Sequence, residues 1–314
     1  MGQNNERQEK HMLSIQQRLR MLEQPTGRID LVLDTDAYNE IDDQFAIAYA
    51  MKATDRLNLL ALYAAPFHNA RSVSGEDGME KSYQEILKLL RLANTEYPVY
   101  RGSTVYLPDE NTPVDSPAAA HLAKLAADYS PDKPLYVVAI GAITNVASAL
   151  LMNPTIADNM VVVWLGGHAL EWPHNAEFNI KQDVAAARVV FASGAPLVML
   201  PCMGVVSHFT STGPELDYWL RGRNELADYL VRQTVDEVNT YAAGCVWSRV
   251  IWDVTTIGWL LNDGNRFMED KLIPTPIPEY DHHWAHDPNR PLCKYVYHIK
   301  RDALMSDLFA HVTK

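Results

Sequence analysis

The sequence has few cysteines and no long apolar run. Its cysteines, Cys202, Cys245 and Cys293, are far apart and odd in number, so they form neither a disulfide framework nor a zinc-ligand pattern. This usage suits a reducing compartment, and we expect a cytoplasmic protein. Because no stretch of about 18 uninterrupted apolar residues is present, no transmembrane segment is predicted and no membrane partner is expected.

Positive charge is also scarce. The chain has 27 Lys and Arg residues against 39 Asp and Glu residues, which gives a net charge of −12. A surface of this sign repels the phosphate backbone, so nucleic acid is not an expected partner. The composition favours a small-molecule ligand instead.

Short apolar runs that alternate with helical patterns are abundant. The apolar runs cover residues 29–33, 57–65, 135–140, 159–165 and 196–200, and the helical patterns cover residues 78–93, 144–151, 183–193 and 225–242, with a further helix from about Ile41. Strands that are apolar throughout are typical of a parallel sheet buried on both faces. We therefore expect an α/β fold, an open, mainly parallel, Rossmann-like sheet with helices on both faces.

The two ends of the chain have a different pattern. Residues 1–27 are predicted to form a separate helical extension, with Met12, Ile15, Leu19 and Leu22 on one helical face. Residues 28–314 are predicted to form one domain. From about Asn262 the chain is rich in Pro and His, and a long loop is expected there before a last strand at residues 294–299.

The segment LVLDTDAYNEIDDQFAIAYA is unusually acidic where a strand is predicted to meet a helix. It places four aspartates and one glutamate within ten positions, Asp34 to Asp43. Asn39 as a helix cap, with Asp42 and Asp43 in the first helical turn, would explain only part of this charge. Carboxylates that converge repel one another unless a cation lies among them, and their hard oxygen ligands favour Ca²⁺ or Mg²⁺.

Three other polar stretches also follow predicted strands, namely APFHN, GAITN and GGHALEWPHNAEFN. In open parallel sheets, ligands bind at the carboxyl ends of the strands. Together with the acidic segment, these stretches therefore predict one site at this edge of the sheet.

Four blocks of the sequence resemble the inosine–uridine-preferring nucleoside hydrolases. LDTD…IDDQFAIAYA is similar to the family's first motif, and VVAIGAITNVASALLMNP to its TGPLTN segment. VVWLGGHALEWPHNAEFNIKQDVAAARVVF and SYQEILKLLRLANTEYPVYRGS resemble two further blocks, in the family's order over residues 28–262. The resemblance implies a hydrolase that cleaves the N-glycosidic bond of a ribonucleoside or a related N-riboside, and a homodimer or homotetramer.

The resemblance also implies roles for individual residues. A Ca²⁺ ion would be held by Asp36, Asp43, the main-chain carbonyl of Ile140 and Asp253. Asp36 would be the base that takes a proton from water, as cleavage of a glycosidic bond by an activated water requires. The residues expected to bind substrate are Asn39, Asp42, His68, Leu165, Glu177, Asn179 and Trp252.

This sequence departs from the family pattern in three places. The family's sugar-binding Asn after the second strand aligns near His68 or Asn69, and the sequence does not distinguish the two. Asp36 and Asp42 enclose five residues where the family has three, so the loop bulges by two residues. Trp252 stands where many members have the His that protonates the departing base; an indole binds a base by stacking but is no general acid. The histidines that could replace this acid are His68, His168, His174, His282 and His283.

Structural roles are open for several of these residues. Glu177 and Asn179 could satisfy loop backbone, and Asp253 could cap the helix that follows it. We expect Thr144 and Asn145 to cap the helix at residues 144–151.

Two other functions are also open. One is a Ca²⁺-dependent ribose- or nucleoside-binding protein without efficient catalysis. The other is a phosphatase of the haloacid-dehalogenase type with Asp34 as nucleophile, although Tyr38 occupies the position where that family has Thr or Ser.

Overall fold

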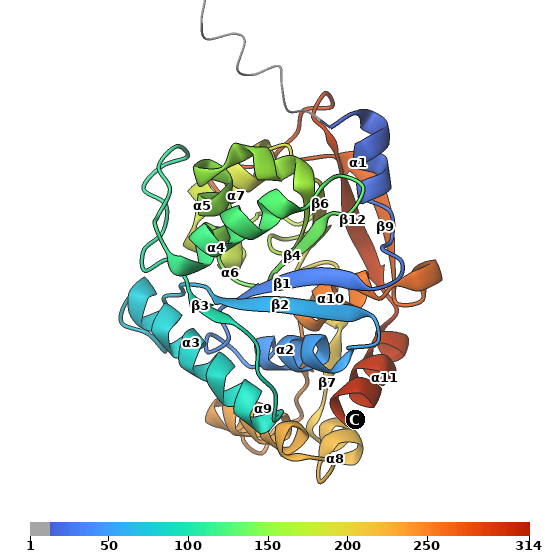
Figure 1. Ribbon diagram of the computed structural model, residues 1–314. Coiled ribbons are helices and arrows are strands. Elements are labelled where there is room, and N and C mark those ends of the chain that lie inside the picture. Colours follow the sequence, from blue (N-terminus) through green and yellow to red (C-terminus); the bar gives the residue numbers. More distant parts are fainter. Residues whose placement is uncertain (1–12) are drawn as a thin grey trace, which may run out of the picture.

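An eight-stranded sheet forms the centre of the computed structural model, which describes residues 13–314 (Figure 1). The strand order is β3-β2-β1-β4-β5-β6-β12-β9. Neighbours pair in parallel from β3 to β12, and β9 alone in this sheet runs antiparallel to its neighbour. The predicted α/β fold with an open, mainly parallel sheet is confirmed.

The strands of this sheet are β1 Ile29–Thr35, β2 Leu57–Ala64, β3 Val99–Arg101, β4 Leu135–Ala139, β5 Met160–Leu165, β6 Leu197–Leu200, β9 Met268–Pro274 and β12 Leu292–Ile299. Two small antiparallel pairs lie outside it, β7 Thr210–Ser211 with β8 Arg249–Val250 and β10 Ile277–Pro278 with β11 Trp284–Ala285. The α-helices are α1 Ile15–Met21, α2 Asp43–Lys52, α3 Gly75–Leu92, α4 Pro117–Leu125, α5 Thr144–Met152, α6 Phe178–Gln182, α7 Val184–Ala192, α8 Gly213–Leu220, α9 Glu225–Ala242, α10 Val254–Leu260 and α11 Arg301–Val312.

Helices cover both faces of the sheet. Helices α4, α5 and α7 pack on one face, and α2, α10 and α11 lie on the other (Figure 1). Leu31 and Leu33 of β1 belong to the core on the α2 side, whereas Val32 belongs to the core on the α5 side. Successive strand side chains point to opposite faces, so a strand that is apolar at every position is buried on both.

The N-terminal helix exists, but its buried face differs from the predicted one. Met21 and Leu22 are buried in the core, whereas Ile15 is 74% exposed. Arg18 is buried instead, and its guanidinium donates a hydrogen bond to the carbonyl of Gly194 at 2.5 Å. The prediction for Ile15 was therefore wrong, and Met12 lies outside the described residues.

The C-terminal region contains more regular structure than predicted. The predicted last strand is present as β12, and residues 275–291 before it contain only the short strands β10 and β11. The expected loop begins later than predicted, because residues 268–274 form β9, which pairs with β12 along the edge of the sheet. Three of the seven residues of β9 are exposed, among them Lys271, and the strand also carries acidic residues, so its sequence lacks the apolar pattern of the central strands. Within residues 13–314, no helix has the length and apolar character that a membrane crossing requires.

Candidate active site

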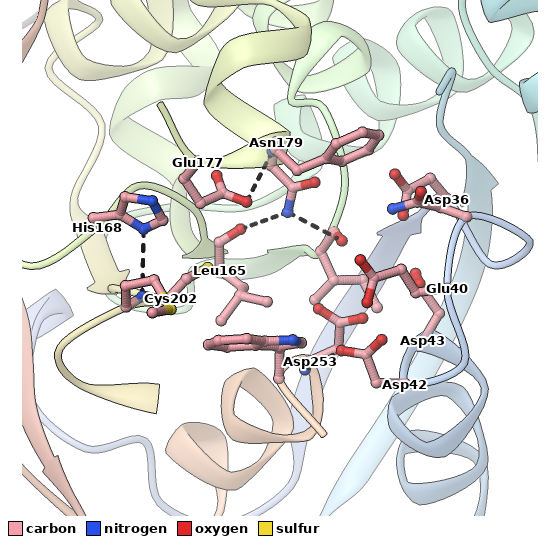
Figure 2. Close-up of a pocket in the computed structure, with 15 residues that line it drawn as sticks. Asp36, Glu40, Asp42, Asp43, Leu165, His168, Glu177, Asn179, Cys202 and Asp253 are labelled. Carbon is pink, nitrogen blue, oxygen red and sulfur yellow. Dashed lines mark hydrogen bonds between the residues drawn. The ribbon is translucent and has the colours of Figure 1, made fainter. Parts of the chain in front are cut away.

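A cavity of about 200 Å³ lies beyond the carboxyl ends of β1, β4 and β5 (Figure 2). The predicted site residues that line it are Asp36, Asn39, Asp42, Asp43, Ile140, Leu165, Glu177, Asn179, Trp252 and Asp253. They come from the loop after β1, the end of β4, the segment from β5 to α6, and the residues before α10. The fold thus brings together segments that are more than 200 positions apart in the sequence.

Three aspartates form a close cluster at one side of the cavity. Asp42, Asp43 and Asp253 are buried, and each has a carboxylate oxygen within 4.8 Å of those of the other two. Burial and the neighbouring carboxylates raise the pKa of Asp43 and Asp253 well above the usual range and that of Asp42 to about 7. Thr35 donates a hydrogen bond to Asp43 at 2.5 Å, which fixes one of these carboxylates.

The carboxylate of Asp36 has no hydrogen-bond partner for either oxygen among the described residues, although both oxygens are buried. Its pKa is raised well above the usual range, first by burial and then by Asp43. Such a group is costly to bury without a partner. The backbone next to it is closely packed, since a Cβ on Gly141 would lie 3.0 Å from the Asp36 carboxyl carbon.

These groups fit a divalent cation. The donors are carboxylate oxygens with the carbonyl of Ile140 beside them, a set that suits Ca²⁺ or Mg²⁺ rather than a softer metal. The carboxylates within 4.8 Å of one another include Asp42, a predicted ribose ligand, and not Asp36, a predicted metal ligand. A cation among Asp42, Asp43 and Asp253 would relieve their repulsion, and Asp36 lines the same cavity.

Glu177 and Asn179 lie on the opposite side, at the start of α6 (Figure 2). Glu177 caps this helix, because its carboxylate accepts hydrogen bonds from the backbone N–H groups of Asn179 and Ile180, at 2.9 and 3.1 Å, and from that of Gly167 at 2.9 Å. The Asn179 amide donates to the carbonyl of Leu165 at 2.9 Å. Both side chains therefore satisfy backbone groups, as considered from the sequence, and both also line the cavity.

The two extra residues of the first loop are held from two sides. Glu40 forms an ion pair with Arg249 of β8, and Asn39 accepts a hydrogen bond from the Asn69 side chain at 2.6 Å. His68 is exposed and does not line the cavity; its backbone binds the Gln182 side chain. Of the neighbours His68 and Asn69, it is therefore Asn69 that reaches the site, through Asn39.

Sequence reasoning missed several residues that line the cavity, namely Phe178, Cys202 and Met203, and it left the roles of Glu40 and His168 open. Cys202 and Met203 follow β6, another parallel strand, so the rule that identified the other loops applied to them as well. Of the histidines considered as acids, His168 lines the cavity, whereas His174, His282 and His283 do not.

Thr144 and Asn145 do not cap α5, so that prediction was wrong. The N-cap residue is Ile143, without a side-chain bond. Asn145 instead donates to the buried carboxylate of Asp34 at 2.8 Å, and Thr144 donates to Asp183 at 2.7 Å. Asp34 is fully buried beneath the site, so these side chains serve buried carboxylates rather than the helix end.

Neither Asn39 nor Asp253 caps a helix through its side chain. The N-cap of α2 is Asp42 and that of α10 is Asp253, and neither carboxylate accepts a hydrogen bond from its helix. The acidic cluster thus has no capping function in the described structure.

Comparison with known proteins agrees with this architecture. The chain is 28% identical to the non-specific ribonucleoside hydrolase RihC of Salmonella typhimurium over 262 residues, which cover 75% of this chain and 79% of that protein. A purine-preferring ribonucleoside hydrolase from Gardnerella vaginalis has a similar fold, with a TM-score of 0.74 at 19% identity over 90% of this chain and 98% of that one. An inosine-uridine preferring nucleoside hydrolase from Bacillus anthracis gives a TM-score of 0.68 at 14% identity, over 91% and 99% of the two chains.

The family resemblance predicted from four sequence blocks is confirmed on a wider span. The family model described as inosine-uridine preferring nucleoside hydrolase matches residues 31–281. That match covers most of the sheet and every segment that lines the cavity. The chain therefore belongs to the inosine-uridine preferring nucleoside hydrolase family.

Proposed function

We propose that this N-glycosyl hydrolase cleaves the bond between ribose and base in ribonucleosides or related N-ribosides and that it uses a bound Ca²⁺ ion. The observation that carries the proposal is the Asp36 carboxylate, whose two buried oxygens lack partners beside the cluster of Asp42, Asp43 and Asp253. Asp36, Asp43, Asp253 and the carbonyl of Ile140 would hold the ion. When bound, the ion would supply positive charge for water activation and for orientation of the ribose hydroxyls.

The side chains divide the remaining work. Asp36 accepts the proton of the attacking water. Asp42 and Glu177 accept hydrogen bonds from ribose hydroxyls, and Asn179 binds a further one. The carboxylates also stabilise the positive charge that develops on the sugar as the glycosidic bond breaks.

Release of ribose from inosine, uridine and p-nitrophenyl riboside tests the proposal, measured with Ca²⁺ and with excess chelator. We expect turnover with Ca²⁺ that chelation abolishes and that Asp36→Asn reduces by about 10²–10⁴-fold, the usual contribution of a general base. If calorimetry shows that ribose binds but none of the three ribosides releases ribose, the protein is instead a binding protein without catalysis. The phosphatase alternative has no structural support, because Asp34 is buried outside the cavity and bonded to Asn145.

We also propose a homo-oligomer in a reducing compartment. Tyr218 and Trp219 of α8 are 73% and 49% exposed, and large aromatic side chains on a surface favour association. Light scattering of the purified protein tests the oligomeric state. The three cysteines are free in the structure, in keeping with a reducing compartment.

A further inference from the structure

The cavity offers no strong acid for a departing base. Trp252 has no proton to transfer at neutral pH. The buried ring of His168 accepts a hydrogen bond from the Met203 N–H at its Nδ1, 3.4 Å away, and burial lowers its pKa to about 4. It is therefore neutral at physiological pH.

The other lining groups with protons do not replace this acid. Burial and then the Glu177 carboxylate raise the pKa of the Cys202 thiol, which makes it a weaker acid than an ordinary cysteine. The Glu40 side chain is directed to Arg249, with which it forms an ion pair. Burial raises the pKa of the Asp42 and Glu177 carboxyl groups, but the proposed function uses both as acceptors for ribose hydroxyls. Under that assignment, a substrate whose base must be protonated before it leaves finds no free donor among the described residues that line the cavity.

The charge of the cavity is strongly negative. Six carboxyl side chains line it: Asp36, Glu40, Asp42, Asp43, Glu177 and Asp253. Arg249 forms an ion pair with one of them, Glu40, and so offsets a single negative charge. A bound divalent cation would keep its carboxyl ligands ionised, although burial raises the pKa of each in the protein alone. The ion and Arg249 together carry three positive charges against six carboxyl groups, so the field in the loaded site favours a positively charged ligand.

Aromatic side chains complete this environment. Trp252 and Phe178 line the same cavity as the carboxylates. Indole is the aromatic side chain that interacts best with a cation over its face. An aromatic cation would therefore gain from both the ring and the carboxylates.

We propose that the preferred substrate is an N-riboside whose base carries a positive charge before cleavage, such as a pyridinium riboside. This inference rests on the proposed function and names its substrate class. The bond between C1′ and the ring nitrogen breaks, and its electron pair stays on that nitrogen, so the base leaves as a neutral molecule without a proton. Water supplies the new oxygen on C1′, and its proton passes to Asp36.

Three ribosides separate the parts of this inference. Nicotinamide riboside is cationic and needs no acid, p-nitrophenyl riboside is neutral and needs no acid, and inosine is neutral and needs one. With full-length protein and Ca²⁺, we expect kcat/KM for nicotinamide riboside to exceed that for inosine by at least about tenfold, which corresponds to about 1.4 kcal/mol. Turnover of p-nitrophenyl riboside should lie between the two.

Two variants test the physical causes. Glu40→Gln removes one negative charge and should lower kcat/KM for nicotinamide riboside several-fold more than kcat/KM for p-nitrophenyl riboside. Arg249→Met breaks the same ion pair but keeps the carboxylate, so it controls for loosening of the loop and should not lower kcat/KM for nicotinamide riboside more than for p-nitrophenyl riboside. Glu96→Gln is the matched control, since Glu96 is exposed and does not line the cavity. Trp252→His supplies an acid and should increase inosine turnover toward low pH, without a gain for nicotinamide riboside.

Two results would overturn the inference and leave the proposed function intact. One is faster turnover of inosine than of nicotinamide riboside by the unaltered protein. The other is an equal loss of activity on charged and neutral ribosides in Glu40→Gln. Absence of turnover for all three ribosides with Ca²⁺ bound would overturn the proposed hydrolysis itself.

Discussion

At the scale of single residues, Asp36 combines a functional position with a cost to stability. Its carboxylate is buried next to other carboxylates and, within residues 13–314, has no donor within hydrogen-bond distance. An uncompensated buried charge is strongly destabilising, and strain of this kind is common at functional sites. The residue should therefore stabilise the fold only when a cation is bound.

Asp36→Asn tests this trade-off. In chelator, we expect the variant to have a free energy of unfolding higher by about 1–3 kcal/mol, because the buried Asp36 must either take up a proton on folding or carry an unpaired charge, and an amide does neither. Ca²⁺ should stabilise the unaltered protein by mass action but should stabilise the variant less. Thermal unfolding with chelator and with excess Ca²⁺ measures both effects, and an Asp36→Asn protein that gains as much from Ca²⁺ as the unaltered one would exclude Asp36 as a ligand.

At the scale of elements, the inserted loop and the β7–β8 pair depend on each other. Arg249 of β8 forms its ion pair with Glu40, and its side chain is only 20% exposed. Residues 243–248 link α9 to β8. The ion pair therefore holds the end of this linker against the loop after β1. A partly buried Arg–carboxylate pair contributes more than an exposed one.

Arg249→Met should therefore loosen both segments. We expect faster amide hydrogen exchange in residues 37–41 and 243–250, by about tenfold, with little change in the central strands. Hydrogen exchange followed by mass spectrometry measures this. Arg101→Met is the control, because Arg101 forms a comparable pair with Glu80 in which both side chains are more than 40% exposed, and unchanged exchange in Arg249→Met would show that the ion pair does not hold the loop.

The elements also show what the sequence could reveal. Central strands such as β1 and β5 were predictable because burial on both faces requires apolar residues throughout. Strand β9 was not, since an edge strand keeps polar positions and its pairing with β12 is a tertiary contact. Helix α11 was not predicted either, since its N-cap residue, Lys300, forms no capping hydrogen bond.

The site follows the same division. The acidic positions could be identified because helix capping explains only part of so much negative charge. The blocks that contain them also follow one another as in the family. The hydrogen bond from Asn145 to Asp34 could not be predicted, because it depends on the burial of Asp34 more than 100 positions away. The sequence left His68 and Asn69 as alternatives for a similar reason: two adjacent residues of a loop differ in direction, and sequence spacing does not resolve that difference.

At the scale of the whole molecule, the C-terminal helix supports the element that carries the site. Helix α11 packs on α2, which begins at Asp43. Asp307 of α11 accepts a hydrogen bond from Tyr49 of α2 and forms an ion pair with His311 at 3.2 Å. The end of the chain is thus joined to the helix whose first residue lines the cavity.

This junction makes stability depend on pH through His311, which is mostly buried and lies in the last turn of α11. The hydrogen bond with Asp307 raises the pKa of His311 above its usual value of 6.5, and a helix C-terminus also favours its protonated form. Because the pKa is higher in the folded state, this stabilisation is fully present below pH 6.5 and is lost as the pH rises through the folded-state pKa. His311→Gln should therefore lower the free energy of unfolding by about 1 kcal/mol at about pH 5.5 and by less at about pH 8.5. Urea denaturation at both pH values, with the exposed His286→Gln as control, measures the difference, and an equal loss at the two pH values would show that His311 stabilises the helix by packing rather than by charge.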